Sequence, residues 1–108
     1  MEMTLREVCD TLKVSRRAVQ GYEKAGLVCA SGKNRYGYLI YDEHAQERIR
    51  QIKLFQQLGF TLKEIKEIID APNPVVKAAL RERVEKLQEK REDLDELISK
   101  AYELIETL

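Results

Sequence analysis

Hydrophobic residues recur at helical spacing in the first dozen positions of the chain. The apolar stripe consists of Leu5, Val8, Cys9 and Leu12. Steps of three and four residues place these side chains on one face of an α-helix. Thr4 and Glu7 stand at the spacing of a capping box, in which each side chain satisfies a free backbone N–H of the first turn. The pattern therefore predicts a helix that begins after Thr4.

A second short helix is predicted after a turn at Lys13. Ser15 is a favourable N-cap, and Gly26 provides the end of the helix. The inner face holds Ala18, Val19 and Tyr22, and the outer face holds Arg16, Arg17, Gln20 and Lys24. Two helices joined by a tight turn are typical of a helix-turn-helix. Lys13 is then expected to be left-handed, at a cost of about 1 kcal/mol.

The hydrophobic period then changes from helical to extended. Leu27-Val28-Cys29 and Tyr38-Leu39-Ile40-Tyr41 flank a polar loop that spans residues 30 to 37 and contains glycine. This order is typical of a β-hairpin with a longer loop. The loop carries Lys33 and Arg35. A basic hairpin directly after a helix-turn-helix is interpreted as a wing, whose cations can bind phosphates beside the helix.

Two further helices are predicted after the hairpin. The first is capped by Asp42 and ends at Gly59, with the apolar positions Ala45, Ile49, Ile52, Phe55 and Leu58. Thr61 and Glu64 form a second capping box, which is followed by a buried side made of Leu62, Ile65, Ile68 and Ile69. The single histidine, His44, falls in a first helical turn and is expected to be exposed rather than catalytic.

The segment Ala71-Pro72-Asn73-Pro74 interrupts the helical pattern because a residue before proline is steered away from helical geometry. Residues 71–74 are therefore predicted to be a hinge, with Asn73 capping a new helix and Pro74 at its first position. No glycine or proline follows as far as Leu108. The pattern predicts a helical rod of roughly 50 Å.

The predicted rod carries a heptad seam. Its members alternate in steps of four and three, and they are Leu80, Val84, Leu87, Arg91, Leu94, Ile98, Ala101, Ile105 and Leu108. Only Arg91 among them is polar. Because a lone charged helix is marginal in water, the seam is expected to be a homodimer interface. Leu97 and Leu104 widen the stripe near its end, which suggests contact with more than one neighbour.

These elements predict a mainly α protein. Residues 1–70 form a winged helix-turn-helix DNA-binding domain with a second helix pair, and residues 75–108 form a long C-terminal coiled-coil dimerisation helix. The formal net charge of the 108 residues is zero, which argues against a nonspecific polybasic binder. Between residues 13 and 41, however, six basic residues stand against one acidic residue. The positive field is therefore local.

Other features of the sequence argue against several classes of protein. No apolar run is long enough to cross a bilayer and the N-terminus has no signal-peptide character, so a cytoplasmic protein without a membrane partner is expected. Cys9 and Cys29 belong to no ligand spacing and are expected to be buried free thiols, so no metal site and no cofactor are expected. With one histidine and no phosphate-binding loop, no catalytic constellation can be assembled, and the protein is not expected to be an enzyme.

The outer face of the second helix points to an anionic partner. Arg16 and Arg17 occupy its first turn, where the helix dipole disfavours positive charge by up to about 1 kcal/mol. Phosphates would relieve this conflict, and Arg and Gln side chains read guanine and adenine in the major groove. Arg16, Arg17 and Gln20 are thus the candidate base-reading residues. The alternative is an ordinary solvated surface helix.

Five stretches, taken in order, resemble the MerR family of bacterial transcription regulators. They are Thr4-Leu5-Arg6-Glu7-Val8, Val14-Ser15-Arg16-Arg17, Tyr22-Glu23-Lys24-Ala25-Gly26-Leu27, Gly37-Tyr38 with Tyr41, and Leu58-Gly59-Phe60-Thr61-Leu62-Lys63-Glu64-Ile65. The resemblance covers residues 3 to about 70. It implies an antiparallel coiled-coil homodimer that binds double-stranded DNA at a pseudo-palindromic promoter, bends and untwists it, and assists RNA polymerase.

The resemblance also implies roles for single residues. Arg17, Tyr22 and Tyr38 match the helix arginine, the second helix aromatic and the wing tyrosine of the family. With Arg16, Gln20 and Lys24 on the helix and Lys33 and Arg35 on the wing, they complete the candidate DNA-binding set. Gln20, Gly21 and Leu39 depart from the family, which often has arginine, an aromatic residue and a wing arginine there. Fewer phosphate contacts imply weaker binding or another operator.

Two alternatives to a promoter-binding transcription regulator remain. One is a DNA-bending repressor or recombination accessory factor, and the other is a coiled-coil adaptor that no longer binds DNA. The regulatory signal is also open. No cysteine stands near the end of the last helix, where metal-sensing members of the family carry theirs. A protein partner, a small pocket at the dimer interface or protein abundance could supply the signal, unless the chain is a fragment.

Overall fold

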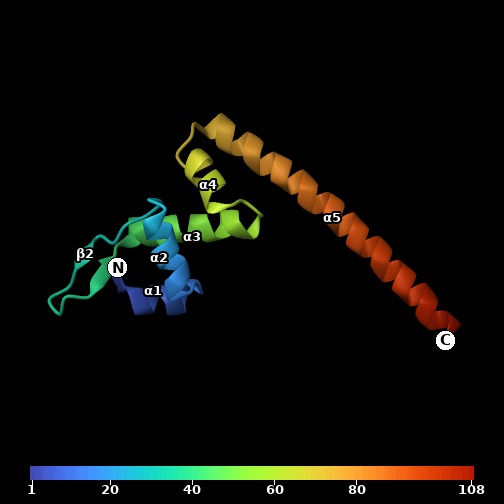
Figure 1. The fold of residues 1–108 in the computed structure, drawn as a ribbon, viewed down its shortest axis with the longest axis horizontal. Helices are drawn as coiled ribbons and strands as arrows, with labels where there is room; N and C mark the ends of the chain where they lie inside the picture. The colour runs from blue at the N-terminus through green and yellow to red at the C-terminus, as the bar shows by residue number, and fades with distance from the viewer. The chain divides into compact units, whose positions relative to one another are not determined.

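The computed structural model describes all residues from Met1 to Leu108 and divides into two compact units, Met1–Asp70 and Ala71–Leu108 (Figure 1). The structure is mainly helical with one small sheet, as predicted. Its elements in order are β1 (Met3–Thr4), α1 (Leu5–Leu12), α2 (Arg16–Lys24), β2 (Gly32–Lys33), β3 (Leu39–Tyr41), α3 (Glu43–Gln57), α4 (Leu62–Ile68) and α5 (Asn73–Thr107).

The predicted helix starts are confirmed by their caps. Both capping boxes are complete, Thr4 with Glu7 before α1 and Thr61 with Glu64 before α4. The hydroxyl of Ser15 accepts from the Ala18 N–H at 2.9 Å and begins α2. Each cap satisfies a backbone donor that the first turn leaves free, so these short helices begin where their local sequence directs.

The turn between α1 and α2 has the backbone geometry that the sequence requires. Lys13 is left-handed, with φ 57° and ψ 47°. Its backbone N–H donates to the Cys9 carbonyl, and the Val14 N–H donates to the same oxygen at 3.3 Å. This single left-handed residue reverses the chain, so that α1 and α2 pack against each other as a helix-turn-helix.

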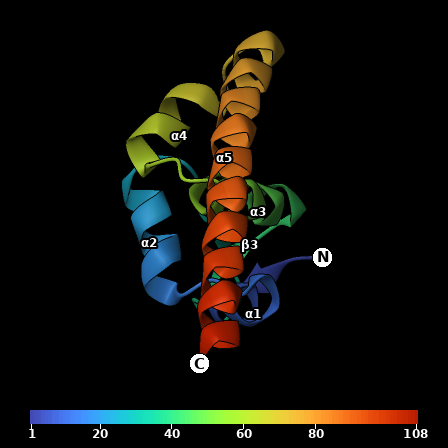
Figure 2. The ribbon, with the colours of Figure 1, turned by 90° about the vertical axis from the view of Figure 1, so that its right-hand side faces the viewer.

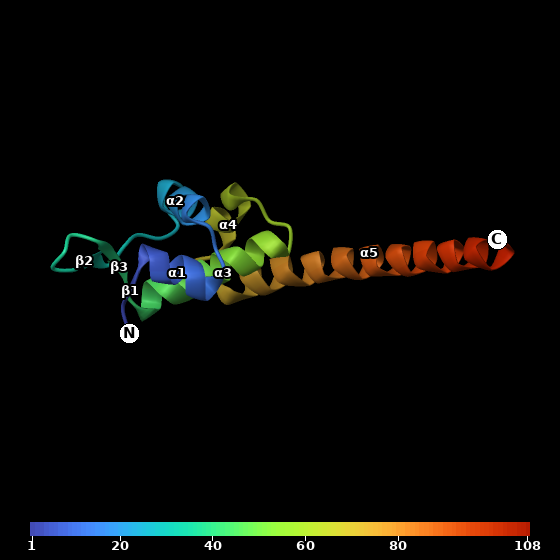
Figure 3. The same ribbon diagram turned by 90° about the horizontal axis from the view of Figure 1, so that it is seen from below.

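The sheet differs from the predicted hairpin in two respects. The first hairpin strand is Gly32–Lys33 rather than Leu27-Val28-Cys29, so Lys33 lies in a strand and not in the loop. The sheet also has a third, unpredicted strand, β1, and its order is β1-β3-β2 with antiparallel neighbours. Met3 is paired with Tyr41, and Lys33 with Leu39. The hairpin that contains β2 and β3 projects from the first unit (Figures 1 and 3).

The core of the first unit lies where α1, α2, α3 and α4 meet the sheet. Its largest fully buried side chains are Tyr41, Ile49, Ile52, Ile65, Val8 and Val19. Gln46 is the one buried polar residue, and its amide donates to the carbonyls of Met1 and Tyr41 at 2.7 and 2.8 Å. These two bonds hold the first residue and the end of β3 against α3.

Cations from α3 and α4 hold the C-terminal ends of the helix-turn-helix. Lys53 donates from Nζ to the carbonyls of Leu12 and Lys13, at 3.1 and 2.8 Å. Lys66 donates to the Ala25 carbonyl at 2.9 Å, directly after α2. Because the last carbonyls of a helix lack internal partners and carry a partial negative charge, these lysines stabilise both helix ends.

The second unit is a single helix, α5, which appears unbroken in Figure 2. It begins at Asn73, and its N-cap is Pro72, which makes no side-chain capping bond. The prediction that Asn73 caps this helix is therefore wrong, because Asn73 and Pro74 already lie in the first turn. At about 1.5 Å per residue the helix is about 52 Å long. None of its residues is buried.

Two smaller predictions have different outcomes. His44 is exposed, as expected. The thiols are not buried as expected, because Cys9 is half-buried and Cys29 is exposed. Cys29 lies in the irregular segment that replaces the first predicted strand, where no neighbouring strand covers it. No helix has both the length and the apolar character that a membrane crossing requires.

Candidate nucleic-acid interface

The outer face of α2 presents only positive and neutral polar groups. Arg16, Arg17, Gln20 and Lys24 are all exposed, and none forms an ion pair or a side-chain hydrogen bond within the chain. This placement agrees with the face assigned from helical periodicity. A helix N-terminus and two free guanidinium groups thus point away from the protein at the same place, which is suited to binding an anion.

The one carboxylate of α2 is held away from this face. Glu23 accepts a hydrogen bond from the Tyr41 hydroxyl, with 2.6 Å between Oη and Oε1. Tyr41 is fully buried, and burial together with this carboxylate raises the pKa of its phenol well above the ordinary value. The hydroxyl therefore stays protonated as a donor. This contact keeps Glu23 from neutralising the cations of the outer face.

Tyr22 has a different environment from the one expected of a DNA-contacting residue. Its side chain is only 2% exposed, and its hydroxyl donates to the Gln56 amide oxygen on α3 at 2.6 Å. Burial raises the pKa of this phenol. The hydroxyl is thus used inside the protein, and Tyr22 positions α2 on α3. A direct contact between Tyr22 and DNA stays a prediction.

The wing, defined here as residues 32–41, is shaped by Asn34. The side-chain oxygen of Asn34 accepts from the backbone N–H groups of Tyr36 and Tyr38, at 2.9 and 3.1 Å. The Asn34 N–H donates to the Tyr38 carbonyl at 2.9 Å, and Gly37 takes a positive φ of 83°. These bonds make a tight tip, so the side chains around it have defined positions without a core beneath them.

The predicted wing residues are exposed at this tip. Lys33 forms no ion pair, and the Arg35 guanidinium lies 5.1 Å from the centre of the Tyr36 ring. Tyr38 is 65% exposed. An Arg on an aromatic face keeps its charge and its outward donors, so both wing cations remain available to phosphate.

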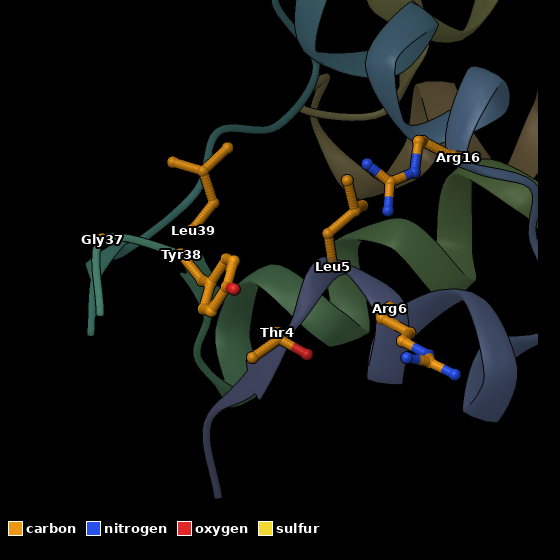
Figure 4. Close-up of a pocket in the computed structure, with 7 residues that line it drawn as sticks. All are labelled: Thr4, Leu5, Arg6, Arg16, Gly37, Tyr38 and Leu39. Atoms are coloured by element: carbon orange, nitrogen blue, oxygen red, sulfur yellow. The ribbon is translucent and has the colours of Figure 1, made fainter. Parts of the chain in front are cut away.

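A hollow of about 560 Å³ lies between the wing and the starts of α1 and α2. Figure 4 shows Tyr38 and Leu39 on one side of it and Arg16 on the other, with Leu5 between them. Its lining residues are Thr4, Leu5, Arg6, Arg16, Gly37, Tyr38 and Leu39. The hollow therefore joins one predicted helix residue, Arg16, to one predicted wing residue, Tyr38.

Arg6 is a member of this site that sequence reasoning missed. It is exposed in the first turn of α1, forms no ion pair, and lines the hollow together with Arg16 (Figure 4). The sequence did contain an indication of this role, because Arg6 lies outside the apolar stripe of α1 and close to the N-terminus of that helix, where the helix dipole is positive. The sequence did not reveal that α1 and α2 begin on the same side of the wing.

The cationic side chains of α3 and α4 that hold the fold together differ from those of α2 and the wing in having partners within the chain. Arg48 on α3 donates to the Leu27 carbonyl and forms a two-bond ion pair with Asp70 at 2.7 and 2.6 Å. Lys53 and Lys66 are likewise bonded to carbonyl oxygens. The cations of α2 and the wing have no such internal partners. The surface of α2 and the wing therefore carries positive charge that no internal partner neutralises, as do the exposed side chains of Arg6 on α1 and Lys63 on α4.

The hollow is lined by two arginines, two hydroxyl-bearing side chains, two leucines and a glycine. No group of three or more His, Cys, Asp or Glu side chains is arranged to hold a metal ion. The residues that line the hollow include no carboxylate that could transfer a proton and no histidine or cysteine that could bind a metal ion. What the arrangement can do is bind an extended polyanion across a helix, a groove and a hairpin.

Comparisons with known proteins agree with this geometry. Residues 3–72 match the model of the MerR HTH family regulatory proteins, and residues 46–105 match the model described as MerR, DNA binding. The HTH-type transcriptional activator mta of Bacillus subtilis is 37% identical over 98 residues, which are 91% of this chain and 38% of that protein. The mercuric resistance operon regulatory protein of Bacillus cereus is 32% identical over 69 residues, 64% of this chain and 52% of that protein.

A solved structure shows the same architecture. The crystal structure of MtaN, the N-terminus of the Bacillus subtilis multidrug transporter activator, has a TM-score of 0.70 and 34% sequence identity. The likeness covers 95% of this chain and 97% of that one. The chain thus spans about two fifths to one half of the length of these two curated relatives, and nearly all of this solved N-terminal piece. The helix-turn-helix, the wing and the long helix together show that the chain belongs to the MerR family of regulatory proteins.

Proposed function

We propose that this chain is a sequence-specific, DNA-binding transcription regulator that acts as a homodimer on a pseudo-palindromic promoter, which it bends or untwists. The observation that carries the proposal is the outer face of α2, where four exposed side chains include three cations without internal partners. Residues 1–70 bind DNA and residues 75–108 pair the two subunits, with residues 71–74 as the hinge between them.

Different residues have different tasks in this proposal. Arg16, Arg17 and Gln20 read base edges, because they lie in the first turns of α2, where a recognition helix enters the major groove. The backbone is positioned by Lys24, Lys33, Arg35, Tyr38 and Arg6. The hollow between α2 and the wing is where a phosphate-sugar strand passes, with Arg16 on one side and the Tyr38 hydroxyl on the other.

The exposed stripe of α5 supports the homodimer. Leu94, Ile98 and Ile105 are 58%, 53% and 61% exposed in the single chain. The predicted interface also contains Leu80, Val84, Leu87, Arg91, Ala101 and Leu108. Burying apolar area contributes about 25 cal/mol per Å², so pairing two such stripes provides the stability that an isolated helix lacks.

The relatives support the regulatory part of the proposal. One is described as a transcriptional activator and another as an operon regulatory protein. By analogy, bound dimers assist or block RNA polymerase at a promoter, which makes the polymerase a further partner. This role would place the protein in the cytoplasm. It requires no cofactor and no metal ion.

The base-reading role is tested with Arg17→Ala. A preferred site is first selected from random duplexes with the unmodified protein, and binding is then measured by gel shift. Arg17→Ala is expected to lower specific affinity by about 1–3 kcal/mol and to relax preference at one base pair. The matched control is Arg50→Ala, which removes an exposed arginine of α3 that pairs with Glu47. Equal affinity of Arg17→Ala and unmodified protein would overturn the assignment.

The dimer is tested separately with Leu94→Asp. A carboxylate in the apolar seam is expected to convert the dimer to monomer in light scattering, because an unpaired buried charge is costly. Ser99→Asp, one position beyond Ile98 and outside the seam, is the control and should leave the dimer intact. A Leu94→Asp protein that stays dimeric contradicts the α5 interface.

A coiled-coil adaptor without DNA is the second candidate. It is favoured by Leu39, which is 38% exposed on the wing at a position where the family usually has arginine. The two candidates differ in one measurement. A regulator binds random duplex DNA with affinity that falls steeply as salt rises, and an adaptor shows no such binding.

A further inference from the structure

Gly21 lies within the outer face of α2, among the residues proposed to read bases. Arg17 precedes it by four residues and Lys24 follows it by three, so the three residues share one stripe of the helix, next to Gln20. Figures 2 and 3 show α2 at one edge of the first unit. The helix backbone is therefore bare at a point where the proposed function places DNA.

Nothing inside the protein requires glycine at this position. Gly21 does not have the positive φ that Gly26, Gly37 and Gly59 have. A Cβ atom at residue 21 would have no neighbour within 4 Å outside the adjoining backbone of α2 itself. Glycine inside a helix is destabilising relative to alanine, because its backbone loses more conformational freedom on folding. The fold alone would therefore be more stable with alanine here.

The outer face of α2 is low in the middle and high at its ends. The long side chains of Arg16 and Arg17 stand in the first turn, and the long side chain of Lys24 stands in the last. Between them lie Gln20, which is shorter, and Gly21, which has no side chain. A helix of this profile can bring its own backbone close to a group that projects from the floor of a groove, and glycine permits such an approach.

The backbone at Gly21 can accept an apolar group only. Its carbonyl already accepts the Ala25 N–H at 2.9 Å, and its N–H belongs to the hydrogen-bonded interior of α2. No backbone donor or acceptor is thus left for a phosphate or for the polar edge of a base. The apolar group that each A·T base pair presents in the major groove is the C5-methyl group of thymine.

We propose that a thymine methyl group of the operator packs against the bare backbone of Gly21, beside the Gln20 amide, which is suited to reading adenine. Gln20 and Gly21 together then give α2 a preference for A·T base pairs. This inference rests on the proposed function, because it requires α2 to lie in the major groove. It makes Gly21 a specificity-determining residue, although it has no side chain.

The first test removes single methyl groups from the DNA. Deoxyuridine differs from thymidine only by the missing methyl group. Each thymine of the selected site is replaced in turn by deoxyuridine, in both half-sites, and binding of the full chain is measured by fluorescence anisotropy. At one position the replacement is expected to weaken binding about fourfold per half-site, which is the value of one buried methylene.

The second test adds a methyl group to the protein. Gly21→Ala is expected to bind the thymine-containing site about tenfold more weakly or worse, because an extra carbon overfills a packed contact. On the duplex with deoxyuridine at the position found above, Gly21→Ala should recover the affinity that the unmodified protein has for that duplex. Deoxyuridine at other positions should give no recovery. Recovery at one position identifies the thymine that packs against Gly21.

Thermal melting separates this role from a structural one. Gly21→Ala is expected to raise the melting temperature by about 4–8 °C while it weakens binding. The matched control is Thr11→Ala, which also introduces a better helix former, at an exposed position of α1. It should leave both the affinity and the deoxyuridine profile unchanged. A Gly21→Ala protein that loses stability together with affinity overturns the proposal.

Other outcomes overturn the proposal in distinguishable ways. If Gly21→Ala binds the thymine-containing site as tightly as the unmodified protein, DNA does not approach α2 at this point. An equal loss on every duplex assigns the contact to deoxyribose and not to a thymine methyl group. Tighter binding by Gly21→Tyr would show that Gly21 leaves a gap and makes no contact.

Failure of the inference and failure of the proposed function give different results. A preferred site that shows no coupling between Gly21→Ala and deoxyuridine contradicts only the thymine contact. A protein that selects no preferred site from random duplexes, and whose DNA binding does not fall as salt rises, contradicts the proposed function and this inference with it.

Discussion

The hydroxyl of Tyr41 donates a hydrogen bond of 2.6 Å to the carboxylate of Glu23, and this contact joins the end of the wing to the helix proposed to read DNA. Tyr41 is fully buried at the end of β3, and Glu23 lies in the last turn of α2. The same bond orients α2 on the sheet and draws its single acidic group inward.

Removing this hydroxyl should affect both stability and DNA binding. Tyr41→Phe leaves the Glu23 carboxylate without its donor, and the loss of a hydrogen bond to a charged group is expected to cost about 1–2 kcal/mol in urea unfolding. The freed carboxylate turns toward the cations of α2, so DNA affinity should also fall, by several-fold at low salt. Fluorescence anisotropy with a labelled duplex measures the second effect.

Tyr22→Phe is the matched control for Tyr41→Phe. It removes the hydroxyl that donates to Gln56 and releases no charge. It should therefore reduce stability by about 1 kcal/mol. Because this hydroxyl is used inside the protein, the affinity of the folded protein should not change, a result that would contradict the predicted contact between Tyr22 and DNA. If both variants lose affinity equally, the effect comes from packing of α2 and not from Glu23.

Substituting the wing cations should change the salt dependence of DNA binding in the way expected for phosphate contacts. Lys33→Ala and Arg35→Ala are each expected to reduce the slope of log affinity against log salt by about 1, and to weaken binding to all sequences about equally. Arg50→Ala serves again as the control, with an unchanged slope. A wing variant that changes base preference but not the slope would assign that residue to base reading.

Lys53 is expected to stabilise the helix-turn-helix through its two bonds to the end of α1. Lys53→Met keeps the aliphatic stem and removes the donor, so the free energy of unfolding should fall by about 1–2 kcal/mol. Lys63→Met, at an exposed position of α4 with no ion pair, should change it by less than about 0.5 kcal/mol. Equal stability of the two variants would show that water serves these carbonyls as well as Lys53 does.

Acid should destabilise the first unit through three carboxylates with lowered pKa values. Backbone hydrogen bonds lower the pKa of Glu7 at Thr4 and of Asp42 at Ala45, and the hydrogen-bonded Arg48 lowers the pKa of Asp70. Groups with a folded pKa below the unfolded one add stability above the unfolded value, and this stability is lost as pH falls through the folded value. The melting temperature should therefore hold to about pH 5 and fall below about pH 4.

Asp42→Asn separates the charge from the cap in this pH series. Asparagine still accepts the Ala45 N–H and caps α3, but it does not titrate. The variant should show a shallower fall of melting temperature below pH 4 than the unmodified protein. An identical acid profile would mean that Asp42 has the same pKa in the folded and unfolded chains.

The helices could be predicted from the sequence because their signals are local. The caps at Thr4, Ser15, Asp42 and Thr61 each lie within three residues of their partners. The helical periodicity of the sequence also predicts which residues lie on the outer face of α2, and these residues are its candidate DNA-binding residues. The placement of these residues in one exposed surface agrees with that prediction, and their contact with DNA stays a proposal.

The missed features depend on contacts between distant residues. Strand β1 is two residues long and exists because Met3 meets Tyr41. The apolar side chain of Leu27 predicts a strand there, but the Leu27 N–H donates to the Tyr22 carbonyl and the Leu27 carbonyl accepts from Arg48. With both backbone groups in use, no strand can form there. The hollow and the role of Arg6 likewise arise only when α1, α2 and the wing are assembled.

In α2 the residues that stabilise the fold differ from those that face outward, and this separation affects how the DNA preference of such a protein can evolve. Folding relies on Ser15, Val19, Tyr22 and Glu23, which supply the cap, the packing and the internal bonds. Arg16, Arg17, Gln20 and Lys24 contribute nothing to the interior. On the proposed base-reading role, exchanging these outward residues one at a time would change operator preference on a scaffold whose thermal tolerance remains intact.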